Sequence, residues 1–113
     1  MKKILIIFII LIIILILTLF SIIKFHVYNP FSAFTGMIQI LFTDTEYTVV
    51  QNIPNKVIFA QPNRKLLDDY MKERGFKHSE EEQLGSVLVY RKKDQKEIIH
   101  FSINKYYSKW IWD

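Results

Sequence analysis

Residues 4–23 read ILIIFIILIIILILTLFSII, a run of twenty residues without a charge, a glycine, a proline or an alanine. Eleven are Ile, five are Leu and two are Phe, so Thr18 and Ser21 are the only polar members. A helix of this length rises about 30 Å, which matches the hydrocarbon layer of a bilayer. The run predicts one transmembrane helix over residues 4–23, through which the chain contacts the lipid bilayer.

A secretory signal sequence is the alternative to a permanent anchor, because it also combines basic residues with an apolar run. The apolar part of a signal is usually about 7–15 residues long and ends in a small-residue cleavage site. Here the run is longer, and no A-x-A pattern follows it. We therefore expect an uncleaved signal-anchor of a cell-envelope protein.

The basic residues that flank the run predict its orientation. Lys2 and Lys3 precede it, whereas Lys24 is the only Lys or Arg on its other side before Lys56. Basic residues are enriched on the cytoplasmic side of a span. We therefore expect a single-pass protein of the cell membrane, with residues 1–3 in the cytoplasm and the C-terminal domain outside.

The net charge of +4 does not indicate a nucleic-acid partner. Lys2, Lys3 and Lys24 supply three of these charges, and the rest of the chain holds twelve Lys and Arg against eleven Asp and Glu. No basic stripe interleaves with aromatic residues to follow a phosphate backbone. The chain also lacks Cys, which excludes disulfides and thiolate metal sites.

Residues 24–43 form a juxtamembrane amphipathic segment. The pair Asn29-Pro30 predicts a break, since the residue before proline avoids the helical region. Apolar residues then recur at helical spacing: Phe31, Phe34, Ile38, Leu41 and Phe42. Two alternatives stay open, a helix packed on the globular domain and a helix lying in the membrane interface.

Residues 44–113 predict a small α+β domain. Two β-rich runs, 47–51 and 56–61, precede a helix that Pro62 and Asn63 open and Gly75 ends. Residues 76–78 could begin a short strand, and clearer strands follow at 86–92, 97–104 and 106–112. The expected order after the anchor is (α)ββαβββ, an antiparallel sheet with one packed helix.

Signatures of catalysis are missing from the sequence. It has no phosphate-cradling glycine loop, no G-x-S-x-G elbow and no HExxH helix, so we expect no enzyme and no cofactor. Ser86 enters a strand without a neighbouring base, and the adjacent Asp68 and Asp69 point in different directions on a helix. His78 with Glu80–Glu82 could offer metal ligands, but such a charge run is typical of a solvated loop, and no metal site is assigned.

The aromatic C-terminus is the one candidate interaction surface. Alternation along residues 106–112 places Tyr106, Trp110 and Trp112 on one strand face. Tyr and Trp favour surfaces that are both apolar and wet, such as protein interfaces and lipid headgroups. The cluster is therefore either a binding platform or part of the core of a small domain.

The arrangement resembles that of many small single-pass membrane proteins of low-GC Gram-positive bacteria. They share a Met-Lys-Lys start, an Ile-rich anchor and a short exported α+β domain. The resemblance is one of layout and implies no activity, site residue or oligomeric state.

The leading hypothesis is a membrane-anchored interaction module whose partner is a membrane protein or a cell-wall component. One alternative is a small envelope enzyme or metal-binding module that uses His78, His100 and the glutamate run. Another is an immunity-type protein that blocks a membrane-active partner.

Overall fold

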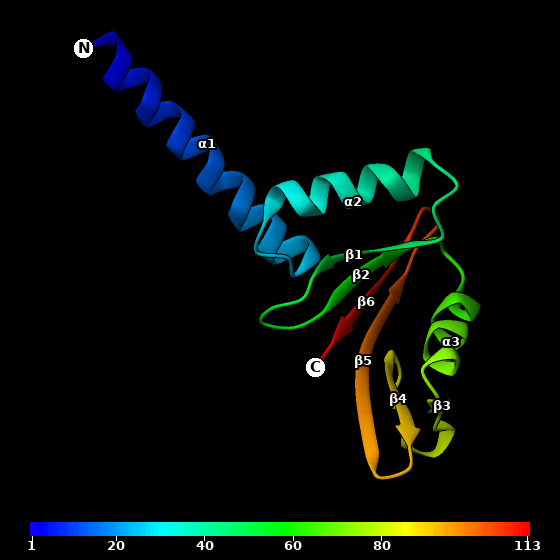
Figure 1. Ribbon diagram of the computed structural model, residues 1–113. Coiled ribbons are helices and arrows are strands. Elements are labelled where there is room, and N and C mark those ends of the chain that lie inside the picture. The colour runs from blue at the N-terminus through cyan, green and yellow to red at the C-terminus, as the bar shows by residue number, and fades with distance from the viewer.

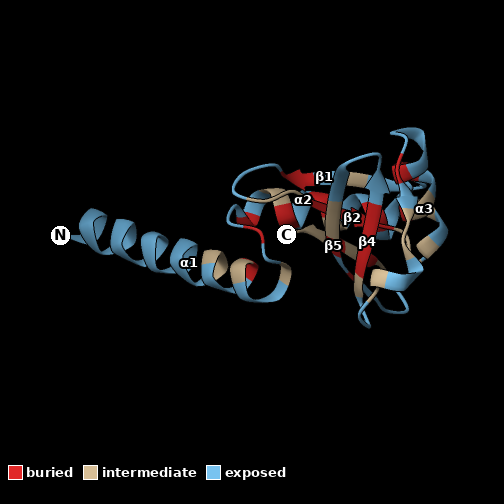
Figure 2. Ribbon diagram, turned by 90° about the horizontal axis from the view of Figure 1, so that it is seen from below, coloured by how far each residue is buried: buried red, intermediate tan, exposed pale blue.

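The computed structural model describes all 113 residues, in an elongated molecule of 62 × 29 × 23 Å (Figure 1). Helix α1 (Lys2–Phe25) forms one end and projects away from the folded part. Figure 2 shows most of α1 as exposed, and Ser21 is its only buried residue. By length and composition α1 could cross a membrane, a property that it shares with a signal sequence near an N-terminus.

The chain turns sharply between α1 and α2 (Pro30–Phe42), at the break that the Asn29-Pro30 pair predicts. His26 ends α1 in the left-handed region, with φ 60°, and its N–H donates to the Ile22 carbonyl at 3.0 Å. Asn29 caps α2, because its side-chain oxygen accepts from the N–H groups of Phe31 and Ser32. Proline at the first helical position costs no hydrogen bond.

The remaining elements form one six-stranded antiparallel sheet in the order β1-β2-β6-β5-β4-β3. Its strands are β1 (Tyr47–Gln51), β2 (Val57–Ala60), β3 (Lys77–His78), β4 (Val87–Lys92), β5 (Gln95–Ile103) and β6 (Ser108–Trp112). Helix α3 (Arg64–Glu73) lies between β2 and β3, and a 3₁₀ turn, η1 (Glu80–Glu82), precedes β4. The last strand, β6, therefore pairs between β2 and β5.

Helices cover the sheet on opposite sides (Figure 1). On the α3 face, Ile58, Ala60 and Trp110 join α3 residues such as Leu67 and Met71 in a cluster of eleven buried residues. On the α2 face, a smaller cluster of six comprises Val27, Ala33, Ile40, Val50, Val57 and Phe59. Alternate residues of β2 belong to different clusters, so this strand is buried on both sides.

The predicted α+β class, long apolar N-terminal helix and antiparallel sheet are confirmed. The structure differs from the expected order in one detail, because the Lys77–His78 segment pairs with β4 and gives a sixth strand. Helix α2 packs on the sheet, which is one of the two alternatives that the sequence leaves open, so two helices rather than one cover it; the small residues Ala33 and Gly36 allow the close approach.

Gly36 is the residue that lets α2 lie close to the sheet. A Cβ atom at this position would overlap Val50 Cγ1 and lie 3.3 Å from Phe59 Cδ2. Val50 is buried and its branched side chain has few alternative rotamers. The helix therefore cannot carry a larger residue here without moving away from β1.

We expect Gly36→Val to destabilise the fold by about 1–3 kcal/mol through overpacking against Val50. The matched control is Thr35→Val, which adds the same side chain at an exposed neighbouring position and should change stability little. Thermal unfolding of the full chain in detergent micelles, followed by tryptophan fluorescence, compares the two. Equal midpoints for both variants would contradict close packing at Gly36.

Candidate functional site

Helix α2 exposes a row of bulky apolar residues and buries the side that carries the small residues Ala33 and Gly36. Its buried residues are Pro30, Ala33, Gly36 and Ile40. The apolar residues that define its helical periodicity are instead 43–79% exposed; we call them the outer stripe: Phe31, Phe34, Ile38, Leu41 and Phe42. No charged residue interrupts this helix. The helix packs on the domain, as one alternative expected, but the bulky residues face away from it.

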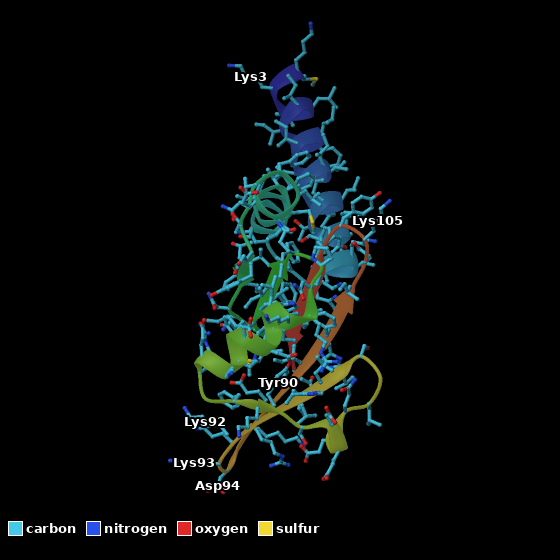
Figure 3. All side chains as sticks on the ribbon, turned by 90° about the vertical axis from the view of Figure 1, so that its right-hand side faces the viewer. Lys3, Tyr90, Lys92, Lys93, Asp94 and Lys105 are labelled. Atoms are coloured by element: carbon cyan, nitrogen blue, oxygen red, sulfur yellow. The ribbon has the colours of Figure 1, made fainter.

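The outer stripe lies at the end of the domain that carries α1. Figure 3 shows α2 end-on beside the last turns of α1, with the sheet beyond both helices. Lys105, in the β5–β6 loop, lies at the same end, whereas Asp94 at the β4–β5 hairpin tip lies at the opposite end. Tyr106 is 64% exposed next to Lys105. The outer stripe, Tyr106 and Lys105 thus lie at the end of the domain from which α1 projects.

Specific contacts fix the corner between α1 and the sheet. The Gln51 side chain accepts from the Tyr28 N–H at 2.8 Å and donates to the Asn55 carbonyl at 2.9 Å. The Ser21 hydroxyl donates to the Val27 carbonyl at 2.6 Å. Phe25 packs against Phe59 and Tyr107, with ring centroids 5.2 and 6.3 Å away. The direction of α1 relative to the sheet is therefore defined by the chain itself.

The structure does not assemble the predicted aromatic platform. Trp110 and Trp112 share the α3 face of β6, as their alternation predicts, but Trp110 has no exposed surface. Its indole N–H donates to the Ser108 hydroxyl at 3.1 Å. Trp112 is half-buried and donates to Glu97 at 2.7 Å, while Tyr106 lies outside the strand. The core interpretation therefore holds for Trp110, because α3 covers this face of the sheet.

A pocket of about 400 Å³ lies on the other face of β5 and β6, beside the turn that follows α1. Its charged or titratable residues come from three distant segments: His26, His100, Lys109 and Asp113. Hydroxyl groups of Ser86 and Ser102 also line it. We call it the basic pocket, because Lys24 lies close enough to Lys109 to add its positive charge.

The positive charges of Lys109 and Lys24 lie close together at the basic pocket. Lys109 is half-buried, and its ammonium donates to the Lys24 carbonyl at 2.9 Å. Burial lowers the pKa of Lys109, and the charge of Lys24 lowers it further. Burial also lowers the pKa of His26 below 6.5, with Lys109 and His100 adding to the effect. The carboxylate of Asp113 lies 3.8 Å from the His100 imidazole at the same site.

The other candidate residues from the sequence do not form a catalytic or metal-binding group. His100 shares the basic pocket with Ser86, but no hydrogen bond joins the imidazole to either pocket serine. His78 lies 3.2 Å from the Arg64 guanidinium, and Glu82 pairs with Arg91. No three His, Asp or Glu side chains are placed to share a metal ion.

Asp68 and Asp69 diverge, as their adjacent positions on a helix predict. Asp68 is partly buried and accepts from the Tyr90 hydroxyl at 2.5 Å. Burial and this hydrogen bond raise the pKa of the Tyr90 hydroxyl. Asp69 is exposed. The pair contributes one structural hydrogen bond rather than a site with two carboxylates.

Sequence reasoning missed the basic pocket. His100 and Ser102 alternate with buried Ile99 and Phe101, which indicates a face of β5 that is only partly covered. Nothing in the local pattern, however, pairs that face with Lys109 or with His26, more than seventy residues earlier in the chain. Only the position of β6 in the sheet brings them together.

Replacing Trp110 distinguishes a core residue from a surface platform. We expect Trp110→Ala to lower the free energy of unfolding by about 3–5 kcal/mol, as is typical for a buried large aromatic. Tyr106→Ala should change stability little, because its side chain is exposed. Denaturant unfolding of the full chain measures both. A Trp110→Ala protein of unchanged stability would contradict its place in the core.

Comparison with models of protein families, with curated proteins and with solved structures found no match.

Proposed function

We propose that this chain is a single-pass membrane-anchored interaction module, without enzymatic activity, whose domain rests on the outer surface of the bilayer. Helix α1 is the anchor, and α2 lies in the interface beside it. The partner is a neighbouring membrane protein or a cell-wall component. The observation that carries the proposal is the reversed exposure of α2, whose bulky outer stripe faces away from its own domain.

A lipid surface is a suitable environment for the outer stripe. Fully burying a Leu, Ile or Phe side chain contributes roughly 1.5–3 kcal/mol. Moving even half of the exposed surface of five such residues out of water therefore contributes on the order of 4 kcal/mol. Helices that lie in the membrane interface present such an apolar side to the lipid. The charges that their polar side often carries are supplied here by Lys24, in the last turn of α1, and by Lys105, at the same end of the domain as α1.

The position of α2 in the fold supports the same arrangement. The helix lies beside the last turns of α1, so a bilayer that surrounds α1 also reaches the outer stripe (Figure 3). Tyr106 and Lys105 would then lie at the headgroup level, where aromatic and long basic side chains are enriched. The hairpin that contains Asp94 points into the aqueous phase, where a partner is accessible.

We expect a fluorophore on the outer stripe to report a lipid environment. The chain has no Cys, so Ile38→Cys can be labelled with a single NBD group in reconstituted liposomes. Its emission should shift to the blue and be quenched by lipids brominated near the headgroup. Asp94→Cys, labelled in the same way, is the control and should show neither effect. Equal, water-like emission at both positions would overturn the lipid-seated α2.

Accessibility of the hairpin tip tests the orientation of the domain. We expect Asp94→Cys on intact cells to react with a membrane-impermeant maleimide, because the basic residues Lys2 and Lys3 favour a cytoplasmic N-terminus. A variant with a Cys inserted after Met1, which keeps Lys2 and Lys3, is the matched control and should react only after lysis. Reaction of Asp94→Cys only after lysis would place the domain in the cytoplasm and replace an envelope partner by a cytosolic one.

A further inference from the structure

We propose that the basic pocket binds a phosphodiester group, such as the headgroup of an anionic phospholipid or the repeating unit of a polyol phosphate polymer. The inference rests on the proposed function, which places the pocket beside the end of the membrane span. It is carried by the geometry of the lining residues, above all Lys109, His26 and His100.

Lys109 supplies the main attraction for an anion. Its ammonium group has three N–H donors, and one of them is used by the Lys24 carbonyl. No carboxylate lies within salt-bridge distance of this half-buried charge. Two donors therefore have no protein partner in a pocket that could hold a phosphate oxygen. An anion there would also relieve the repulsion between Lys109 and Lys24.

Two imidazoles line the pocket beside Lys109. His26 comes from the turn after α1 and His100 from β5, and both line the same cavity. Burial, and to a smaller extent the charges of Lys109 and His100, disfavours protonation of His26. A bound anion would add a negative charge beside His26 and so favour its protonated form. Asp113 opposes anion binding, but its carboxylate lies by His100 at 3.8 Å, at one side of the pocket.

The size and polarity of the pocket fit a diester better than a bare phosphate ion. A volume of about 400 Å³ lies in the range of pockets for small organic ligands. Hydroxyl groups of Ser86 and Ser102 and the side chain of Asn55 line it as well. Such groups donate to and accept from polyol hydroxyls, so they suit a glycerol phosphate unit.

Two probes separate the sources of the phosphodiester. The first is glycerophosphoglycerol, the water-soluble headgroup of phosphatidylglycerol, added to the full chain in nanodiscs of phosphatidylcholine. The second is the same chain in nanodiscs that contain phosphatidylglycerol. Imidazole NMR signals of His26 and His100 report occupancy in both. Their shift with the soluble probe indicates a free or polymeric diester, and a shift only in anionic nanodiscs indicates a lipid headgroup; both support the proposal.

Lys109→Gln should weaken binding by about tenfold or more, because it removes a charge-assisted hydrogen bond. The control is Lys93→Gln, which removes an equal charge from the exposed β4–β5 hairpin tip, at the end of the domain away from the pocket (Figure 3). Binding should also tighten as the pH falls below 6.5, since the pKa of His26 is lowered and its protonation adds positive charge beside Lys109 and Lys24, in a pocket that Asp113 and His100 also face. His26→Gln should reduce this pH dependence.

Unshifted imidazole signals with both probes would overturn the proposal. Equal losses for Lys93→Gln and Lys109→Gln would do so too, because they would indicate general attraction to a charged surface. Either result leaves the proposal that α2 lies in the membrane interface unaffected, provided that the label at residue 38 still reports a lipid environment. Loss of that signal as well would remove the proposed function itself.

Discussion

The close approach of α2 to β1 and β2 is the constraint on which the rest of the structure depends. It is possible because the buried side of α2 carries two small residues, Ala33 and Gly36, with Gly36 next to Val50. Once this side is buried, the bulky residues of the helix must point outward. The same packing brings the turn at residues 26–28 onto the sheet, where Gln51 binds it. Exposure of the outer stripe, the direction of α1 and one wall of the basic pocket therefore share a single cause.

Local patterns predict much of the fold because they follow from the geometry of single elements. Alternation in β5, the apolar side of α3 and the left-handed Gly75 at the end of that helix were all readable from the sequence. The side of α2 that meets the domain was not. A rule that buries bulky apolar residues in the protein assigns the outer stripe to the core, whereas the structure leaves these residues exposed. Trp110 shows a second limit of local patterns. Alternation along β6 places Trp110 on one face of the strand, but it does not indicate that α3 covers this face.

The basic pocket depends on topology rather than on local pattern. Strand β6, the last in the chain, pairs with β2 on one side and β5 on the other, and this register sets Lys109 opposite Ser102. His26 reaches the same place only because the corner after α1 folds back onto the sheet. Each of these residues is unremarkable in its own segment. Their shared chemistry arises from contacts between segments that the sequence does not place side by side.

The two buried clusters imply that residues 27–40 fold together with the sheet. The larger cluster, between α3 and the sheet, is built within residues 58–110. The smaller one joins Val27, Ala33 and Ile40 to Val50, Val57 and Phe59, so the juxtamembrane segment is part of the folded unit. A fragment that begins at residue 44 would lose half of this cluster and expose one side of β2 to water. With α2 present, that side is covered, but the outer stripe then requires an apolar neighbour of its own. Under the proposed function, a bilayer beside α1 would meet this requirement without a further protein and would leave the hairpin end of the domain free for a partner.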